Sequence, residues 1–310
     1  MDTSPHVSDF VSVNGVRLHY LDWGGAGPAL LFLAGLGCSA HIFDRFAPRF
    51  TDRFHVLALT RRGHGESDYP DTGYDIDTLT DDIRCFMDTL KIEQAVLVGH
   101  SLAGIELSRF ATLHPTRVLK LVYLDAAYDY ASPNFKAMLA KNPVPRLQPA
   151  DANAEHYALE DYKASLKRCY PALAIMWNEV LDTEMMHSVK FTPEGKVVER
   201  MSDAISQALR DTLNNYSPEI AKISAPMLSF FVNANGTDYL SDAFMSAEQQ
   251  AEVLEFFATV RRPFNQEWIE QFRRAVPHAR IVELSDGHHY CFIMQEKCVL
   301  NAMRSFLLTE

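Results

Sequence analysis

The sequence has little cysteine, no excess of basic residues and no long hydrophobic run. Its 310 residues include five cysteines, and no two of them have the C-x-x-C spacing of a zinc or redox site. An odd number of scattered cysteines does not suggest a disulfide framework, and free thiols are typical of a reducing compartment. We therefore expect a cytoplasmic protein that uses no metal ion and no other cofactor.

Acidic residues outnumber basic residues by 40 to 29, which gives a net charge of −11. Nucleic acids and anionic membrane surfaces both attract basic segments, so we expect neither as a partner. The longest apolar run, from Pro28 to Ala40, is too short to span a bilayer. These exclusions leave a small-molecule substrate as the expected partner, and a monomer or homodimer as the expected state.

Apolar residues make up 47% of the chain and charged residues 22%, values close to those of soluble globular proteins. A disordered chain would contain fewer apolar residues. A chain of 310 residues can bury a large core and still leave room for a pocket. Length alone allows one large α/β domain or two domains of ordinary size.

Short apolar segments alternate with helical patterns along most of the chain. Asn14-Gly15 separates the alternating segments 9–13 and 16–22, and this dipeptide is a strong hairpin signal. Six further segments are candidate buried strands: 29–34, 55–59, 95–98, 119–124, 227–232 and 280–284. Helical spacing appears at 79–90, 103–113 and 297–308. The order predicts an α/β fold with a mostly parallel central sheet of about eight strands and helices on both faces.

The alternation stops after residue 127. From residue 128 to about 215 we find only helical patterns punctuated by prolines. We therefore expect one core domain, formed by residues 1–127 and 216–310, and an inserted all-helical cap, residues 128–215. Open α/β sheets bind ligands at the carboxyl ends of their strands, so the cap is expected to cover that edge.

The sharpest local signal is the segment Gly99-His100-Ser101-Leu102-Ala103-Gly104, which joins a predicted strand to a predicted helix. A serine on such a sharp turn is strained and its hydroxyl is exposed above the sheet. Small residues are needed two positions before and after the serine, and Gly99 and Ala103 meet that need. The helix amino terminus behind Ser101 favours a developing negative charge. This pattern predicts a nucleophilic serine.

With this segment in place, the chain resembles the α/β-hydrolase fold superfamily over nearly its whole length outside the cap. Members of that superfamily carry an oxyanion donor in the loop after the third strand, here Leu33-Ala34-Gly35-Leu36-Gly37. Ala34 replaces the usual histidine of this loop, but the donor is a backbone N–H. The resemblance implies that the N–H groups of Leu36 and Leu102 form the oxyanion hole.

A second loop, residues 60–68, resembles the D-x-R-G-x-G-x-S loop of the superfamily, with Thr60 in place of the aspartate. We interpret this loop as structural, with Arg62 as its anchor.

The superfamily places its catalytic histidine in the loop after the last strand, here residues 285–292. Two neighbouring histidines compete for this role. The dipeptide Gly287-His288 favours His288, whereas the spacing to Tyr290 and to the last helix favours His289. We predict His289, with His288 as the alternative.

The third member of the expected triad is an acid that accepts a hydrogen bond from the histidine. The usual position is the loop after the penultimate predicted strand, residues 233–238, whose first carboxylate is Asp238. Some members carry the acid after the sixth strand instead, and Asp125 stands there, 24 residues after Ser101. We predict Asp125, with Asp238 as the alternative.

The resemblance implies a serine hydrolase that cleaves an acyl bond of a small, largely apolar substrate through an acyl-enzyme. The substrate expected first is a carboxylic ester, and a lactone or an amide would use the same chemistry. Two alternatives stay open. One is a carbon–carbon bond hydrolase or a perhydrolase with the same triad, and the other is a small-molecule receptor that has this fold without catalysis.

Overall fold

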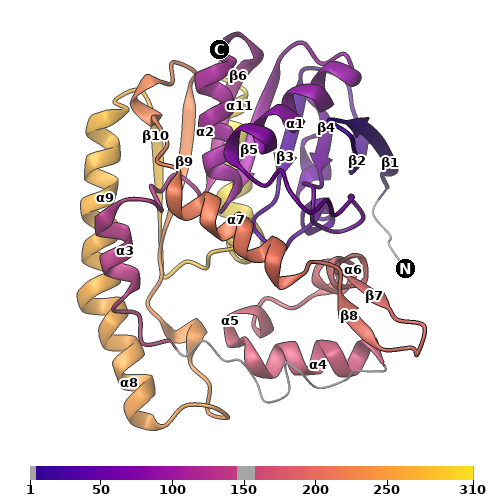
Figure 1. Cartoon of the computed structure of the whole chain (residues 1–310). Helices are drawn as coiled ribbons and strands as arrows, with labels where there is room; N and C mark the ends of the chain where they lie inside the picture. Colours follow the sequence, from indigo (N-terminus) through magenta and orange to yellow (C-terminus); the bar gives the residue numbers. More distant parts are fainter. Residues whose placement is uncertain (1–4, 145–157, 310) are drawn as a thin grey trace.

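The computed structural model describes residues 5–144 and 158–309. The central strands are β1 (Val7–Val13), β2 (Val16–Gly24), β3 (Ala29–Leu33), β4 (His55–Leu59), β5 (Ala95–His100), β6 (Val118–Leu124), β9 (Met227–Asn233) and β10 (Arg280–Ser285). They form one eight-stranded sheet in the order β1-β2-β4-β3-β5-β6-β9-β10 (Figure 1). The predicted α/β class with a mostly parallel sheet is confirmed.

Within the eight-stranded sheet, the amino-terminal strands β1 and β2 run antiparallel to their neighbours. β1 pairs with β2 through a turn at Asn14-Gly15, where φ is 48° and 74°, and β2 pairs with β4. The strands from β4 to β10 in the sheet order pair in parallel. Parallel strands end at one edge of a sheet, so the loops that follow β3, β5, β6 and β10 meet there.

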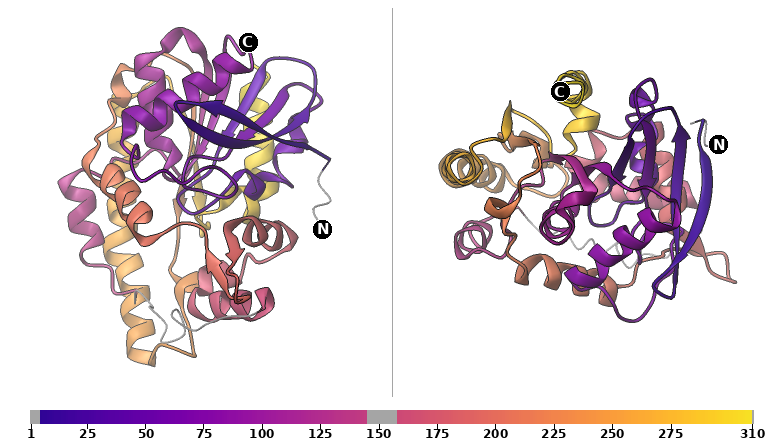
Figure 2. Two further views of the ribbon diagram at one scale, coloured as in Figure 1. Left: turned by 45° about the vertical axis from the view of Figure 1, so that its right-hand side comes forward. Right: turned by 90° about the horizontal axis from the view of Figure 1, so that it is seen from above.

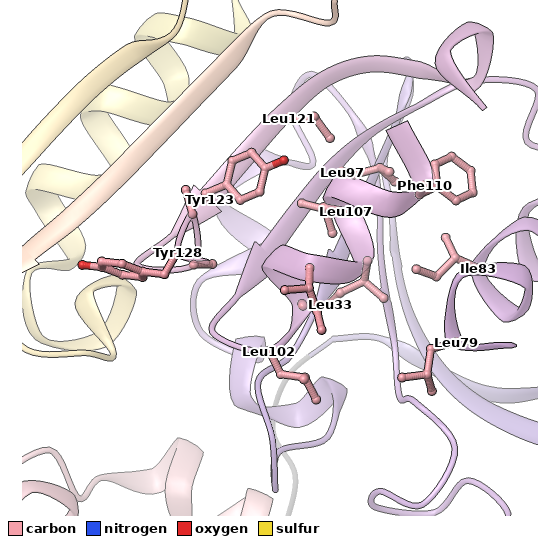
Figure 3. Packing of buried hydrophobic residues seen from close by; sticks show 14 of the residues in the cluster. Leu33, Leu79, Ile83, Leu97, Leu102, Leu107, Phe110, Leu121, Tyr123 and Tyr128 are labelled. Carbon is pink, nitrogen blue, oxygen red and sulfur yellow. The ribbon is translucent and has the colours of Figure 1, made fainter. Parts of the chain in front are cut away.

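Two buried clusters lie on the two faces of the sheet. Along β3, Leu31 belongs to one cluster, and Leu30 and Phe32 belong to the other, because successive strand residues point to opposite faces. Helices α1 (Ile76–Thr89), α2 (Ala103–Leu113), α8 (Ala247–Phe256) and α9 (Arg262–Ala275) contribute to the first cluster. Helices α10 (Cys291–Met294) and α11 (Glu296–Leu307) contribute to the second. Figure 3 shows Leu97, Leu107 and Phe110 packed between β5 and α2.

The cap departs from the prediction in one respect, because it is not all helical. It contains α3 (Pro133–Leu139), α4 (Leu159–Cys169), α5 (Pro171–Ala174), α6 (Glu179–Ser188) and α7 (Asp203–Asn215). Between α6 and α7 it also forms an antiparallel hairpin of β7 (Val189–Phe191) and β8 (Val197–Glu199). Three residues are too few to show a strand period, so the sequence did not reveal these strands.

The cap helices occupy two places. α3 lies beside α9, with the rings of Phe135 and Phe264 5.7 Å apart. Helices α4, α5 and α6 and the β7–β8 hairpin gather below the sheet, at the lower right of Figure 1 and again in Figure 2. The limits of the cap as a unit, residues 128–215, stay a prediction. Across the described residues, we find no helix that is long and apolar enough to cross a membrane.

Candidate active site

Ser101 occupies the turn between β5 and α2. Its φ of 53° lies in the left-handed region, which a non-glycine residue rarely adopts. A Cβ at Gly104 would lie 1.9 Å from the backbone oxygen of Ala126, so only glycine fits there. The close approach lets the chain after β6 pass against α2. The local backbone therefore explains why small residues surround Ser101, with Gly104 under the tightest constraint.

Asp125 directly follows β6 and is buried, with a φ of 49°. Its Oδ2 accepts a hydrogen bond from Nδ1 of His289 at 2.7 Å. Its Oδ1 accepts the backbone N–H of Val232 at 3.1 Å and lies 3.0 Å from the hydroxyl of Tyr128. The structure thus brings the predicted acid and the predicted base together. Val232 and Tyr128 hold the carboxylate oxygen that does not face His289.

Tyr128 and Asn265 form a buried layer behind Asp125 that the sequence analysis missed. The Tyr128 hydroxyl lies 3.0 Å from Oδ1 of Asn265, and Nδ2 of Asn265 donates to the Val232 carbonyl at 2.8 Å. Burial raises the pKa of Tyr128 well above its ordinary value, so the phenol stays protonated. Trp268 completes the layer: its indole N–H donates to the Ala127 carbonyl at 2.9 Å and its ring stacks on Tyr128.

The two alternative residues lie elsewhere in the network. His288 is buried, its Nε2 donates to the carbonyl of Ala172 in α5 at 2.9 Å, and its Nδ1 accepts the N–H of Tyr290. Both nitrogens of His288 are therefore engaged. Asp238, in the short helix η5 (Thr237–Tyr239), acts on His288 only as a nearby charge, and the carboxylate that contacts His289 is that of Asp125.

The loop after β3 passes directly against the serine turn. A Cβ at Gly35 would lie 3.0 Å from the Cβ of Ser101, so this glycine permits the contact. Leu36 follows it, and Leu102 is buried at the start of α2. The Ala34 carbonyl accepts a hydrogen bond from Nη2 of Arg61 at 2.8 Å. The two predicted oxyanion donors thus lie on the segments that flank Ser101.

Arg61 connects this loop to the helix behind the serine. Its Nε and Nη2 both donate to the carboxylate of Glu106 in α2, each at 2.5 Å, and both side chains are buried. The neighbouring Arg62 donates to both carboxylate oxygens of Asp82 in α1, at 2.6 and 2.7 Å. Arg62 therefore contacts the core, as its interpretation as an anchor requires, whereas no local pattern indicated the pair of Arg61 and Glu106.

Two tyrosines complete the surroundings of Ser101 and His289. Burial raises the pKa of the Tyr130 phenol, and the nearby Ser101 side chain lowers it by a smaller amount. Tyr290 follows His289 and is partly buried, and its hydroxyl lies 3.4 Å from Sγ of Cys38 in the loop after β3. His289 itself keeps 35% of its side-chain surface exposed, so a small molecule can approach it.

Among the residues that the structure describes, two groups of side chains elsewhere could hold a metal ion: His6, His41 and Asp44, and His19, His41 and Glu66. Both nitrogens of His19 already have partners, with Thr60 Oγ1 at 3.0 Å from Nδ1 and Ser8 Oγ at 2.9 Å from Nε2. Burial lowers the pKa of His19 to about 4. Hydrogen bonds therefore account for His19 without an ion, and neither group includes Ser101, Asp125 or His289.

Comparison with known proteins finds similarity to hydrolases of one fold. A family model described as the alpha/beta hydrolase fold matches residues 28–165. The 2-(acetamidomethylene)succinate hydrolase of Mesorhizobium japonicum is 39% identical over 101 residues, which make up 33% of this chain and 36% of that protein. A non-heme chloroperoxidase of Streptomyces lividans is 38% identical over 116 residues, 36% of this chain and 42% of that protein. The matches therefore span less than half the length of these curated relatives.

The structural similarity extends over the whole chain. The crystal structure of E-2-(acetamidomethylene)succinate hydrolase matches 98% of this chain and 100% of that chain, with a TM-score of 0.74 and 22% sequence identity. At this identity the similarity shows the fold. The family model covers the first part of this fold, and the structural similarity shows that the chain has the α/β-hydrolase fold.

Proposed function

We propose that the protein is a serine hydrolase that cleaves an acyl bond of a small, largely apolar substrate through an acyl-enzyme on Ser101. The observation that carries this proposal is the 2.7 Å hydrogen bond between His289 and Asp125, next to a serine held at a φ of 53°. A strained serine, a half-exposed histidine and a buried acid are the groups that acyl transfer needs.

In the proposed mechanism, Nε2 of His289 removes the hydroxyl proton as Ser101 attacks the acyl carbon. Asp125 accepts the Nδ1–H of His289, which fixes the tautomer and stabilises the imidazolium that forms. The backbone N–H groups of Leu36 and Leu102 hold the oxyanion. The leaving alcohol or amine takes the proton from His289, and water then attacks the acyl-enzyme in the same way.

The network behind Asp125 supports this assignment. Val232 N–H and the Tyr128 hydroxyl hold the carboxylate in one orientation, so its Oδ2 stays directed at His289. Oriented carboxylate–histidine pairs are more effective because the chemical step requires no reorganisation.

Reaction with a fluorophosphonate probe tests the proposal directly. We expect the wild-type protein to be labelled at Ser101 and the variant Ser101→Ala to remain unlabelled. Peptide mapping of the labelled protein identifies the modified residue. An unlabelled wild-type protein that is folded would instead favour a small-molecule receptor on this fold.

The substrate class is tested with a panel of aryl esters that differ in acyl-chain length, with Ser101→Ala as the blank. Amides form the second arm of the panel. They are included because a relative with the same fold along its whole length acts, by its name, on an acetamido compound. If the protein turns over amides but not the matched esters, the preferred substrate is an amide and not an ester.

A further inference from the structure

Glu184 is a cap residue in α6 whose side chain has no exposed surface and which the proposed mechanism does not use. Its Oε1 accepts the backbone N–H of Ser39 at 2.7 Å, and its Oε2 accepts the Ser39 hydroxyl at 2.7 Å. Ser188, on the next turn of α6, donates a third hydrogen bond to Oε1 at 2.9 Å. A buried carboxylate of the cap is therefore stabilised mainly by one residue of the core.

Ser39 belongs to the loop after β3, three residues beyond Leu36. Its hydroxyl donates to Glu184 and accepts the N–H of His41, so it also caps the short helix η1 (Ala40–Phe43). The start of the loop is held by the core, because Arg61 binds the Ala34 carbonyl. The cap holds the other end, through Glu184.

We infer that Glu184 is a positioning residue that couples the cap to the oxyanion hole. When α6 docks, its carboxylate fixes Ser39 and thereby the backbone N–H of Leu36. When α6 moves away, the loop loses two charge-assisted hydrogen bonds and Leu36 is free to shift. The inference rests on the proposed function, since it gives the Leu36 N–H a role in catalysis. Preorganised donors are effective only at the right place, so the cap would help to control the chemical step.

A neighbouring contact holds α6 against the core independently of Glu184. His187 stacks on His41 with ring centroids 3.8 Å apart and an interplanar angle of 17°. Its Nδ1 lies 3.1 Å from Oε2 of Glu66, in the loop after β4. Because this contact remains, a change at Glu184 is expected to disturb the loop without detaching the cap.

The test uses Glu184→Gln and Ser39→Ala in the full-length protein. In Glu184→Gln an NH₂ group faces one of the Ser39 donors, and in Ser39→Ala the hydroxyl is removed. The matched control is Glu179→Gln, because Glu179 lies on the same helix and its carboxylate is 73% exposed, facing Arg45 of the core at 3.7 Å. The measurements are kcat and KM on the best aryl ester, the rate of Ser101 phosphonylation, and the thermal unfolding midpoint.

We expect Glu184→Gln to lower kcat by about 10- to 100-fold, the order of loss that a small misplacement of a catalytic group produces, with KM changed less than about threefold. Phosphonylation should slow in parallel, and Glu179→Gln should behave like the wild type. The double variant Glu184→Gln/Ser39→Ala should be no slower than the slower of the two single variants, because both changes break the same contact.

The outcomes separate the two proposals. If the wild-type protein neither reacts with the fluorophosphonate nor turns over any substrate, the proposed function fails and the role of Glu184 fails with it. If the wild-type protein is active and Glu184→Gln keeps its kcat within twofold, only the role of Glu184 is overturned. A loss of activity that merely follows a lower unfolding midpoint, or that adds fully to that of Ser39→Ala, would also overturn it.

Discussion

Nε2 of His100 donates a hydrogen bond to the backbone carbonyl of His289 over 3.1 Å, and the two imidazole rings lie 4.6 Å apart. His100 immediately precedes Ser101, so this contact fastens the loop after β10 to the serine turn. Burial lowers the pKa of His100 well below its ordinary value, which keeps the ring neutral. The proposed base is thus held near the proposed nucleophile by a contact that does not involve Asp125.

The first prediction concerns the acid. Asp125→Asn should lower kcat by about 10⁴-fold, because an amide cannot hold His289 in the required tautomer. Asp238→Asn should leave kcat within about threefold of the wild type, since the carboxylate that contacts His289 is that of Asp125. Steady-state kinetics on one aryl ester compare the kcat values of the two variants with that of the wild type. The reverse order of effects would assign the acid to Asp238.

The second prediction separates the two neighbouring histidines. His289→Ala should abolish acyl-enzyme formation while leaving the fold intact, because its side chain is partly exposed and contacts mainly Asp125. His288→Ala should keep a measurable rate of acylation. It should destabilise the protein by about 1–3 kcal/mol, because the partly buried Ala172 carbonyl loses its hydrogen-bond partner. Denaturant unfolding and burst kinetics measure the two effects, and acylation lost in His288→Ala alone would contradict the assignment.

The third prediction concerns the buried pair of Arg61 and Glu106. Arg61→Leu leaves the Glu106 carboxylate buried without its cation, and should lower the free energy of unfolding by about 3–5 kcal/mol. The double variant Arg61→Leu/Glu106→Leu should recover part of that loss, because no charge then stays unpaired. Urea denaturation of the single and double variants gives the coupling. Additive losses would show that the pair does not act as a unit.

The fourth prediction is a loss of stability in acid. Burial lowers the pKa of His19 to about 4 and that of His64 to about 3, from an ordinary value of 6.5. The unfolded chain therefore binds protons at these sites near pH 6.5, whereas the folded protein does not. The free energy of unfolding should be highest above pH 6.5 and fall as the pH decreases towards 4, by at most about 1.4 kcal/mol per pH unit and histidine.

A hydrogen bond from His187 lowers the pKa of Glu66 to about 2, from an ordinary value of 4.5. Protonation of the Glu66 carboxylate therefore also lowers the free energy of unfolding as the pH decreases, but only below pH 4.5. Urea unfolding at pH 4 to 8 tests whether the free energy of unfolding falls as the pH decreases. The variant His64→Gln should show a weaker dependence of this free energy on pH. A stability that is constant from pH 7 down to pH 4.5 would contradict the burial of neutral histidines.

Features encoded by local patterns could be predicted from the sequence. Six of the eight strands of the central sheet appeared in the sequence as apolar runs, and the first two as alternating segments around Asn14-Gly15. The turn at Ser101 appeared as small residues between a predicted strand and a predicted helix. Asp125 was identifiable because it directly follows a buried strand at the catalytic edge.

Contacts between distant residues for which the family resemblance supplies no motif could not be predicted. Tyr128 meets Asn265 across 137 residues of sequence, and Ser39 meets Glu184 across 145. Before folding, Glu184 resembles any acid on an amphipathic helix, and Asn265 resembles any surface amide. Only tertiary packing removes these two side chains from water, and no local pattern of apolar residues in the sequence indicates that they are buried. The hairpin of β7 and β8 was missed for a different reason, the brevity of its strands.

The contact of Trp268 with the Ala127 carbonyl has a spectroscopic consequence. The chain contains only three tryptophans: Trp23 in β2, Trp177 in the cap and Trp268 in α9. Each therefore belongs to a different part of the molecule, and Trp268 stacks on the tyrosine that contacts Asp125. A variant with phenylalanine in place of Trp23 and Trp177 would keep Trp268 as its single tryptophan. The fluorescence of Trp268 would then report on the surroundings of Asp125. Its emission could follow acylation of Ser101 in real time without an added dye.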